Sequence, residues 1–153
     1  MIEARKPDRD TVIPIIKLKV LPEQEQNVAP NAVSIAQGSV EPGATTFGLW
    51  DGETPVGLLM FIDVARSRAC QEEGDDPDSI YIWRLMIDAA HQGKGLGGQA
   101  IALVENHARA LGRSKVMLSA VPGPNSPIPF YEKLGYIKTG RIVEEELELS
   151  KTV

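Results

Sequence analysis

The segment His91–Gly98, HQGKGLGG, contains four glycines in eight residues. The segment before it, YIWRLMID, has the pattern of a strand, and the segment after it, QAIALVENHARAL, that of a helix. Ordering so many glycines costs entropy, so their clustering indicates that something approaches the backbone closely. Free N–H groups at a helix start attract anions, and glycines let the backbone form a concave nest. The segment therefore predicts a phosphate-binding loop.

An ordinary strand-to-helix turn is one alternative, although such a turn needs fewer glycines. Gly93, Gly95 and Gly98 also satisfy the dinucleotide pattern G-x-G-x-x-G. However, residues 88–92 separate the strand from the first glycine, and residues 113–119 contain no acid that would hold a ribose. The loop lysine is not followed by Ser or Thr, which excludes a Walker loop.

Two motifs carry a resemblance to a known family. Gln92–Gly97 matches the pattern Q/R-x-x-G-x-G/A, which resembles the acetyl-coenzyme A loop of the GNAT superfamily of N-acetyltransferases. FYEKLGY, residues 130–136, is similar to the family's F-Y-x-x-x-G-F/Y segment. WRLMID, residues 83–88, is similar to the branch that contains polyamine-acetylating enzymes. The resemblance extends from about Ile2 to Leu149.

The resemblance implies that acetyl-CoA is the cosubstrate and that Tyr131 is the general acid that protonates the leaving thiolate. It further implies that strand N–H groups stabilise the thioester oxygen as it becomes charged. Asn125 resembles an asparagine that often precedes the tyrosine, although the spacing here is one residue shorter. The residues expected to bind the cofactor are Leu85, Met86, Ile87, Gln92, Gly93, Lys94, Gly95, Leu96, Gly97, Gly98 and Asn125.

An alkylamine with a pKa of about 10.4 must lose a proton before it attacks, so the reaction needs a base or a proton-relaying water. Glu25, Asp63 and Asp88 are candidates, and neither their spacing nor the resemblance selects among them. Cys70 lacks a His and Asp pattern that would activate it for an acyl-cysteine route. With only His91 and His107 besides this one cysteine, no zinc-ligand spacing exists, and we expect no metal.

The sequence thus predicts an acetyl-CoA-dependent N-acetyltransferase that moves an acetyl group directly to a primary amine of a small molecule, with diamines and polyamines among the candidates. The alternatives are a coenzyme A-binding regulatory module without turnover, and a protein N-terminal or lysine acetyltransferase. The acidic segment 71–79, QEEGDDPDS, is either a solvated turn or an electrostatic attractor for a cationic substrate.

Length and composition set the wider expectations. The 153 residues favour one domain, residues 1–153. The net charge of −5 and the lack of a basic run argue against a nucleic-acid partner. We expect no membrane partner, because no apolar run approaches the roughly 20 residues of a membrane span. The single cysteine and the lack of an apolar leader at the start predict a cytoplasmic protein.

These motifs need a sheet to position them. The expected fold class is α/β (mixed α+β), with a GNAT-like central sheet of six to seven strands and flanking helices. The unit at about 80–120 should be parallel, whereas the hairpins should be antiparallel. Gly38 and Gly112 are expected C-caps, Pro55 should lengthen a hairpin turn, and Gly140 should be the last turn. The expected strands are 2–6, 45–50, 56–64, 80–87, 116–120, 136–139 and 142–149, and the expected helices are 10–20, 29–37, a four-turn helix ending at Gly112, and 130–134.

The last expected strand, 142–149, is open to edge pairing, which would allow a homodimer. The alternative interpretation is that its acidic residues protect the edge, because charged side chains discourage strand addition.

Overall fold

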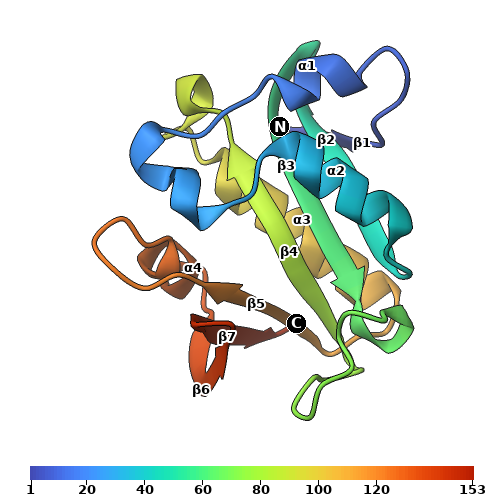
Figure 1. The fold of residues 1–153 in the computed structure, drawn as a ribbon, viewed down its shortest axis with the longest axis vertical. Coiled ribbons are helices and arrows are strands. Elements are labelled where there is room, and N and C mark those ends of the chain that lie inside the picture. The colour runs from blue at the N-terminus through green and yellow to red at the C-terminus, as the bar shows by residue number, and fades with distance from the viewer.

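A computed structural model describes residues 1–153 and contains one seven-stranded sheet in the order β1-β2-β3-β4-β5-β7-β6 (Figure 1). Only β4 and β5 are parallel, and every other neighbouring pair is antiparallel. The expected fold class and the parallel central unit are therefore confirmed. The strands are β1 (Glu3–Arg5), β2 (Ala44–Asp51), β3 (Thr54–Asp63), β4 (Ser79–Ile87), β5 (Lys115–Ala120), β6 (Ile137–Val143) and β7 (Glu146–Thr152).

Helices cover both faces of the sheet, and side-chain alternation along β3 explains why. Leu59 and Phe61 belong to the larger core cluster, which they share with α3 and α4. Leu58 and Met60 point to the opposite face and pack with Ile15 of α1. Figure 1 shows α1 and α2 on one side of the sheet and α3 on the other. The helices are α1 (Val12–Ile16), η1 (Pro22–Asn27), α2 (Asn31–Val40), η2 (Val64–Arg66), η3 (Ala89–His91), α3 (Leu96–Ala110) and α4 (Ile128–Lys133), and none has the length and apolarity needed to cross a membrane.

The helix expected over residues 10–20 is wrong in its second half, because α1 ends at Ile16. The residues after α1 form hydrogen bonds with the segment that follows β4. The Lys19 N–H donates to the Asp88 carboxylate at 2.9 Å, and the Lys19 carbonyl accepts from Ala89 N–H at 2.8 Å. The short helix η1 that follows was not expected from the sequence.

Gly38 does not cap α2, which continues to Val40. A Cβ at Gly38 would collide with Thr46 Oγ1 and the Met60 sulfur, so this glycine allows the helix to pack closely on the sheet. By contrast, Gly112 has φ +71° directly after α3 and its neighbour Arg113 donates to the Ala108 carbonyl, which confirms a Schellman-type end.

Two hairpins differ from expectation. Asp51 pairs with Thr54, so the β2–β3 turn has two residues, and Pro55 pairs opposite Trp50 because a bulge interrupts the ladder there. Gly140 lies inside β6 at a register shift and not in the last turn. That turn is formed by Glu144 and Glu145, with φ +48° and +69°.

The expectation that the chain's last strand is an edge strand is wrong. β7 pairs with β5 on one side and with β6 on the other, so β6 is the edge. β6 presents Ile137 and Ile142, both highly exposed, along that edge.

Replacing Gly57 by alanine should destabilise the fold. An added Cβ would collide with the Met86 main-chain oxygen on the neighbouring strand, which cannot move without disturbing the ladder. We expect a loss of about 2 kcal/mol, as for other overpacked cores, and a fall in melting temperature of about 4–8 °C, measured by thermal unfolding.

Gly98→Ala is the matched control, because its Cβ would lie 3.9 Å from Leu134, an ordinary contact, within a helix. Alanine there should maintain or raise stability by up to about 1 kcal/mol. Equal losses in the two variants would contradict the steric explanation.

Candidate functional site

The sheet opens between β4 and β5. Their pairing runs from Ser79 opposite Lys115 to Ile82 opposite Leu118, and stops there. At this point the pairing of β4 with β3 skips Trp83, which forms a bulge. Bulges are common beside active sites because they redirect a strand. From Trp83 onward, the N–H groups of β4 that point away from β3 have no strand partner.

A cleft of about 620 Å³ occupies this opening. It is lined by the end of β4, the glycine loop, the end of β5, and the start of α4. Of the sequence-predicted residues, it brings together Leu85, Met86, Ile87, Gln92, Gly93, Gly95, Leu96, Gly97, Gly98, Asn125 and Tyr131. Lys94 is exposed on the loop and does not line the cleft. The binding roles of all these residues stay predictions.

The glycine loop has the backbone of an anion site. Gly93 and Gly95 both have φ +77°, and a Cβ on either would extend into open space. α3 begins at Leu96 with no side-chain cap and no acidic residue in its first turn. Its first N–H groups are therefore left for a ligand, and the helix dipole favours a negative one.

The side chain of Gln92 holds the loop to its surroundings. Its Nε2 donates to the Ile87 carbonyl at 3.0 Å and to Gln24 Oε1 at 2.8 Å, and Gln24 Nε2 donates back at 3.2 Å. This amide pair joins η1 to the glycine loop. Gln24 and Asn27 of η1 both line the cleft, and nothing in their sequence spacing identified them.

Tyr131 lies on α4, and only 8% of it is exposed. Burial raises the pKa of its hydroxyl well above the usual value. No protein group forms a hydrogen bond with this hydroxyl, and the residue lines the cleft. A phenol that remains protonated at neutral pH, beside a cavity, can act as a proton donor.

The three candidate bases do not reach the cleft. Asp63 is buried in a two-bond ion pair with Arg113, at 3.0 and 3.1 Å. Asp88 accepts from the main-chain N–H groups of Lys19 and Ala90. Glu25 is exposed and does not line the cleft; it lines another cavity beside α1 and α2, which shares Val20, Val28 and Met86 with the cleft. No carboxylate lines the cleft, which suits a phosphate ligand and leaves it without a carboxylate base.

A second cavity, of about 510 Å³, meets the cleft at the opening of the sheet. Four residues line both: Asn27, Trp83, Arg84 and Ser119. We call these four residues the junction. The second cavity, called the acidic cavity below, is lined by six carboxylates: Glu72, Asp75, Asp76, Glu144, Glu146 and Glu148.

Two junction side chains have buried atoms without partners. Asn27 Nδ2 donates to the Asn125 carbonyl at 2.9 Å, whereas its Oδ1 has no partner. Arg84 donates to the Trp83 carbonyl and to Gln37, and its Nε has no partner. Unmet buried groups are costly, so a bound ligand that satisfies them gains affinity.

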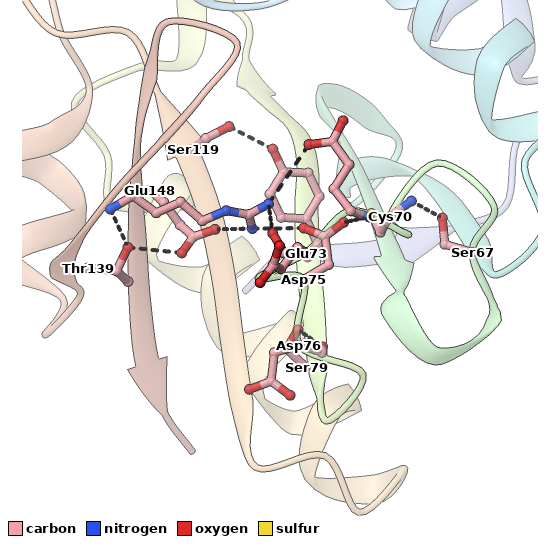
Figure 2. Close-up of polar contacts among 12 residues, drawn as sticks. Ser67, Cys70, Glu73, Asp75, Asp76, Ser79, Ser119, Thr139 and Glu148 are labelled. Atoms are coloured by element: carbon pink, nitrogen blue, oxygen red, sulfur yellow. Dashed lines mark hydrogen bonds and ion pairs between the residues drawn. The ribbon is translucent and has the colours of Figure 1, made fainter.

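The acidic segment 71–79 is tied to the protein and not simply solvated. Arg141 donates to Asp75 at 2.8 Å and to Glu148 at 3.1 Å (Figure 2). Lys115 pairs with Asp76 at 2.6 Å, and Asp78 accepts from the hydroxyl of Ser114. The carboxylates of the acidic cavity that have no ion pair are Glu144 and Glu146, at the β6–β7 turn.

Neither Cys70 nor His107 lines the cleft. Burial raises the pKa of the Cys70 thiol, which disfavours the reactive thiolate. The ring of His107 packs on Phe61 with centroids 4.8 Å apart. His91 lines the cleft at its loop side.

Comparison with known proteins gives a consistent result. A family model described as "Acetyltransferase (GNAT) family" matches residues 16–136. Mycothiol acetyltransferase from Corynebacterium glutamicum is 32% identical over 88 residues, which are 58% of this chain and 26% of the relative. The chain thus spans about a quarter of the length of the curated relatives it matches.

Solved structures share the fold at low sequence identity. The GNAT domain of S. lividans PAT superposes with a TM-score of 0.76 at 14% identity, over 99% of this chain and 89% of that one. Aminoglycoside acetyltransferase AAC(6')-Ib in complex with coenzyme A gives 0.75 at 18%, over 99% and 95%. PaiA N-acetyltransferase from Thermoplasma acidophilum in complex with coenzyme A gives 0.67 at 14%, over 100% and 99%.

Gly95→Ala should weaken coenzyme A binding. The added Cβ would extend into the open space over the loop, where phosphates are expected, and would also strain a left-handed residue by about 1–2 kcal/mol. In the unmodified protein, acetyl-CoA or coenzyme A at about 100 times Kd should raise stability by roughly 2.7 kcal/mol, seen as a shift in melting temperature. In the variant, this shift should be largely lost.

Gly52→Ala is the matched control, because Gly52 has φ +59°, has the same open surroundings, and lies in the β2–β3 turn. It should lose similar stability and keep the full shift with coenzyme A. A shift with NAD alone would instead support the dinucleotide alternative, and no shift with any ligand would contradict the phosphate-binding role.

Proposed function

Because this chain belongs to the acetyltransferase (GNAT) family, we propose that it transfers an acetyl group from acetyl-CoA directly to a primary amine of a small cationic molecule. Acetyl-CoA is the cosubstrate of this family. The observation that carries the proposal is the meeting of two cavities at the opening of the sheet. The cleft has a glycine loop and no carboxylate, whereas the acidic cavity has six carboxylates.

The cleft side would hold the cofactor. N–H groups at the start of α3 and the glycine loop would bind its phosphates. The thioester would lie along the free edge of β4, where N–H groups from the segment Leu85–Ile87 can stabilise the tetrahedral oxyanion. The Tyr131 hydroxyl would then give its proton to the departing thiolate.

The acidic side would hold the acceptor. Glu144 and Glu146 lack ion pairs, and carboxylates left in this state favour a cationic ligand. At the junction, the unmet Asn27 Oδ1 is an acceptor for an amine N–H. Diamines and polyamines combine a reacting amine with a second ammonium group, so they match both features.

The experiments below also test two alternative functions. A basic peptide could place its N-terminal or lysine amine in the acidic cavity, since its charge is similar. A coenzyme A-binding module without turnover would bind the cofactor but acetylate nothing, and the presence of Tyr131 argues for the enzyme. We also propose a cytoplasmic location from the single cysteine, and the exposed edge of β6 as the place where a homodimer would form.

Tyr131→Phe should lower turnover at least tenfold and leave the dissociation constant of coenzyme A nearly unchanged, because only the donated proton is lost. Initial rates at saturating substrates and a calorimetric titration measure the two quantities. Tyr136→Phe is the control: its hydroxyl donates to Glu105, so it should lose stability and keep turnover. Unchanged turnover in Tyr131→Phe would remove the acid role.

Glu144→Gln should raise KM for 1,4-diaminobutane by up to about fivefold, the effect of one partly exposed charge contact, and should make KM less sensitive to salt. A panel of diamines, polyamines, monoamines and a basic peptide, assayed by thiol release, measures this. Glu145→Gln is the matched control, since it removes the same charge from the same turn, and Glu145 does not line the cavity. Peptide acetylation without diamine acetylation would favour the protein-substrate alternative.

A further inference from the structure

Three side chains form a hydrogen-bonded chain at the base of the opening between β4 and β5. Ser119 is the first residue of β5 beyond the last pair with β4, and it lines both cavities. Its hydroxyl donates to the Glu146 carboxylate at 2.7 Å. The Tyr81 hydroxyl lies 2.6 Å from the same Ser119 oxygen, in the contact drawn at Ser119 in Figure 2.

Counting hydrogens fixes the direction of this chain. A serine hydroxyl has one hydrogen and two lone pairs. Because the hydrogen of Ser119 goes to Glu146, Tyr81 must be the donor in the other contact. One lone pair of Ser119 then stays free to accept a proton from a group at the junction.

On the basis of the acetyl transfer proposed above, we propose that Ser119 and Glu146 form a proton relay that removes one proton from the acceptor amine and delivers it to the acidic cavity. Tyr81 positions Ser119 by its hydrogen bond. The relay supplies the carboxylate base that the cleft lacks.

Protons and bonds balance as follows. The ammonium group gives one proton to the free lone pair of Ser119 while Ser119 passes its own hydrogen to Glu146. The neutral amine forms a bond to the thioester carbon, and the carbon–sulfur bond breaks. The second proton, released from nitrogen in the tetrahedral intermediate, restores Tyr131 after Tyr131 has protonated the thiolate. Glu146 then releases its proton to solvent, so the products are the amide, coenzyme A thiol and one free proton.

The neighbouring carboxylates do not compete for this role. Asp75 and Glu148 are held by Arg141, and Asp76 by Lys115. Glu144 is exposed at the turn and forms no hydrogen bond with a junction residue. Glu146 is therefore the carboxylate with a direct hydrogen bond to a junction residue.

Arg84 at the junction favours release of the amine proton, whereas the carboxylates of the acidic cavity attract the ammonium group. Burial at the junction lowers the pKa of the Arg84 guanidinium, and the nearby Tyr81, Glu146 and Glu144 partly offset this effect. A fixed positive charge and partial burial both disfavour an ammonium ion at this point. The other charged and titratable groups that line the acidic cavity with Glu146 are Cys70, Glu72, Asp75 and Asp76 on the loop before β4, Tyr81 and Arg84 on β4, Arg141 on β6, Glu144 in the turn and Glu148 on β7.

The test is the pH dependence of turnover for 1,4-diaminobutane between pH 6 and 10. Ser119→Ala and Glu146→Gln should lower kcat at pH 7 at least tenfold. Near pH 10, kcat of these variants should be within about threefold of the unmodified protein, because the amine then loses its proton to solvent without the relay. Ser119→Thr retains the hydroxyl and should restore most of the rate.

Several controls separate this relay from a structural role. Thermal unfolding with coenzyme A identifies any variant that does not fold, in which case Ser119→Thr and Glu146→Gln carry the test. Glu145→Gln should match the unmodified protein at every pH. A deficit that is equal at all pH values, or no deficit, would overturn the relay while leaving the acetyltransferase function in place. Failure of the unmodified protein to acetylate any amine, despite a shift with coenzyme A, would overturn both proposals.

Discussion

The loss of pairing between β4 and β5 after Ile82 and Leu118 is the constraint on which the rest of the structure depends. Two parallel strands that separate leave main-chain groups without partners, which is costly unless something else bonds them. The bulge at Trp83 redirects β4, and the Gln92 side chain bonds the Ile87 carbonyl at its end. The remaining free N–H groups face a cavity, where a polar ligand can satisfy them.

This opening also separates two kinds of charge. N–H groups and a helix dipole on the cleft side favour anions, while carboxylates on the other side favour cations. The separation is strict, because no carboxylate lines the cleft. The candidate bases Asp63 and Asp88 are each bonded elsewhere. A phosphate-bearing ligand and an amine would therefore each find one side favourable and the other unfavourable.

Local sequence predicted those parts that depend on local chemistry. The glycine loop, Tyr131 and the central strand–helix–strand unit were found because their signals lie within a few consecutive residues, and the family match confirms the resemblance read from them. The Pro55 turn and the Gly140 turn were wrong because long-range pairing decided them. Long-range contacts also occupy two of the candidate bases, Asp63 and Asp88. Ser119, Asn27 and Glu146 come from three distant segments, so only the folded arrangement brings them together.

The β6–β7 turn is a place where substitutions can accumulate in the course of evolution. Glu144 and Glu145 occupy left-handed conformations that glycine or asparagine adopt more easily, so this turn is held by its flanking strands and not by its own residues. It lies on a different element from the glycine loop, and neither Glu144 nor Glu145 lines the cleft. A new side chain at Glu144, which lines the acidic cavity, would alter which acceptor fits without disturbing the cofactor cradle. Acceptor range and cofactor use can therefore diversify separately within one scaffold.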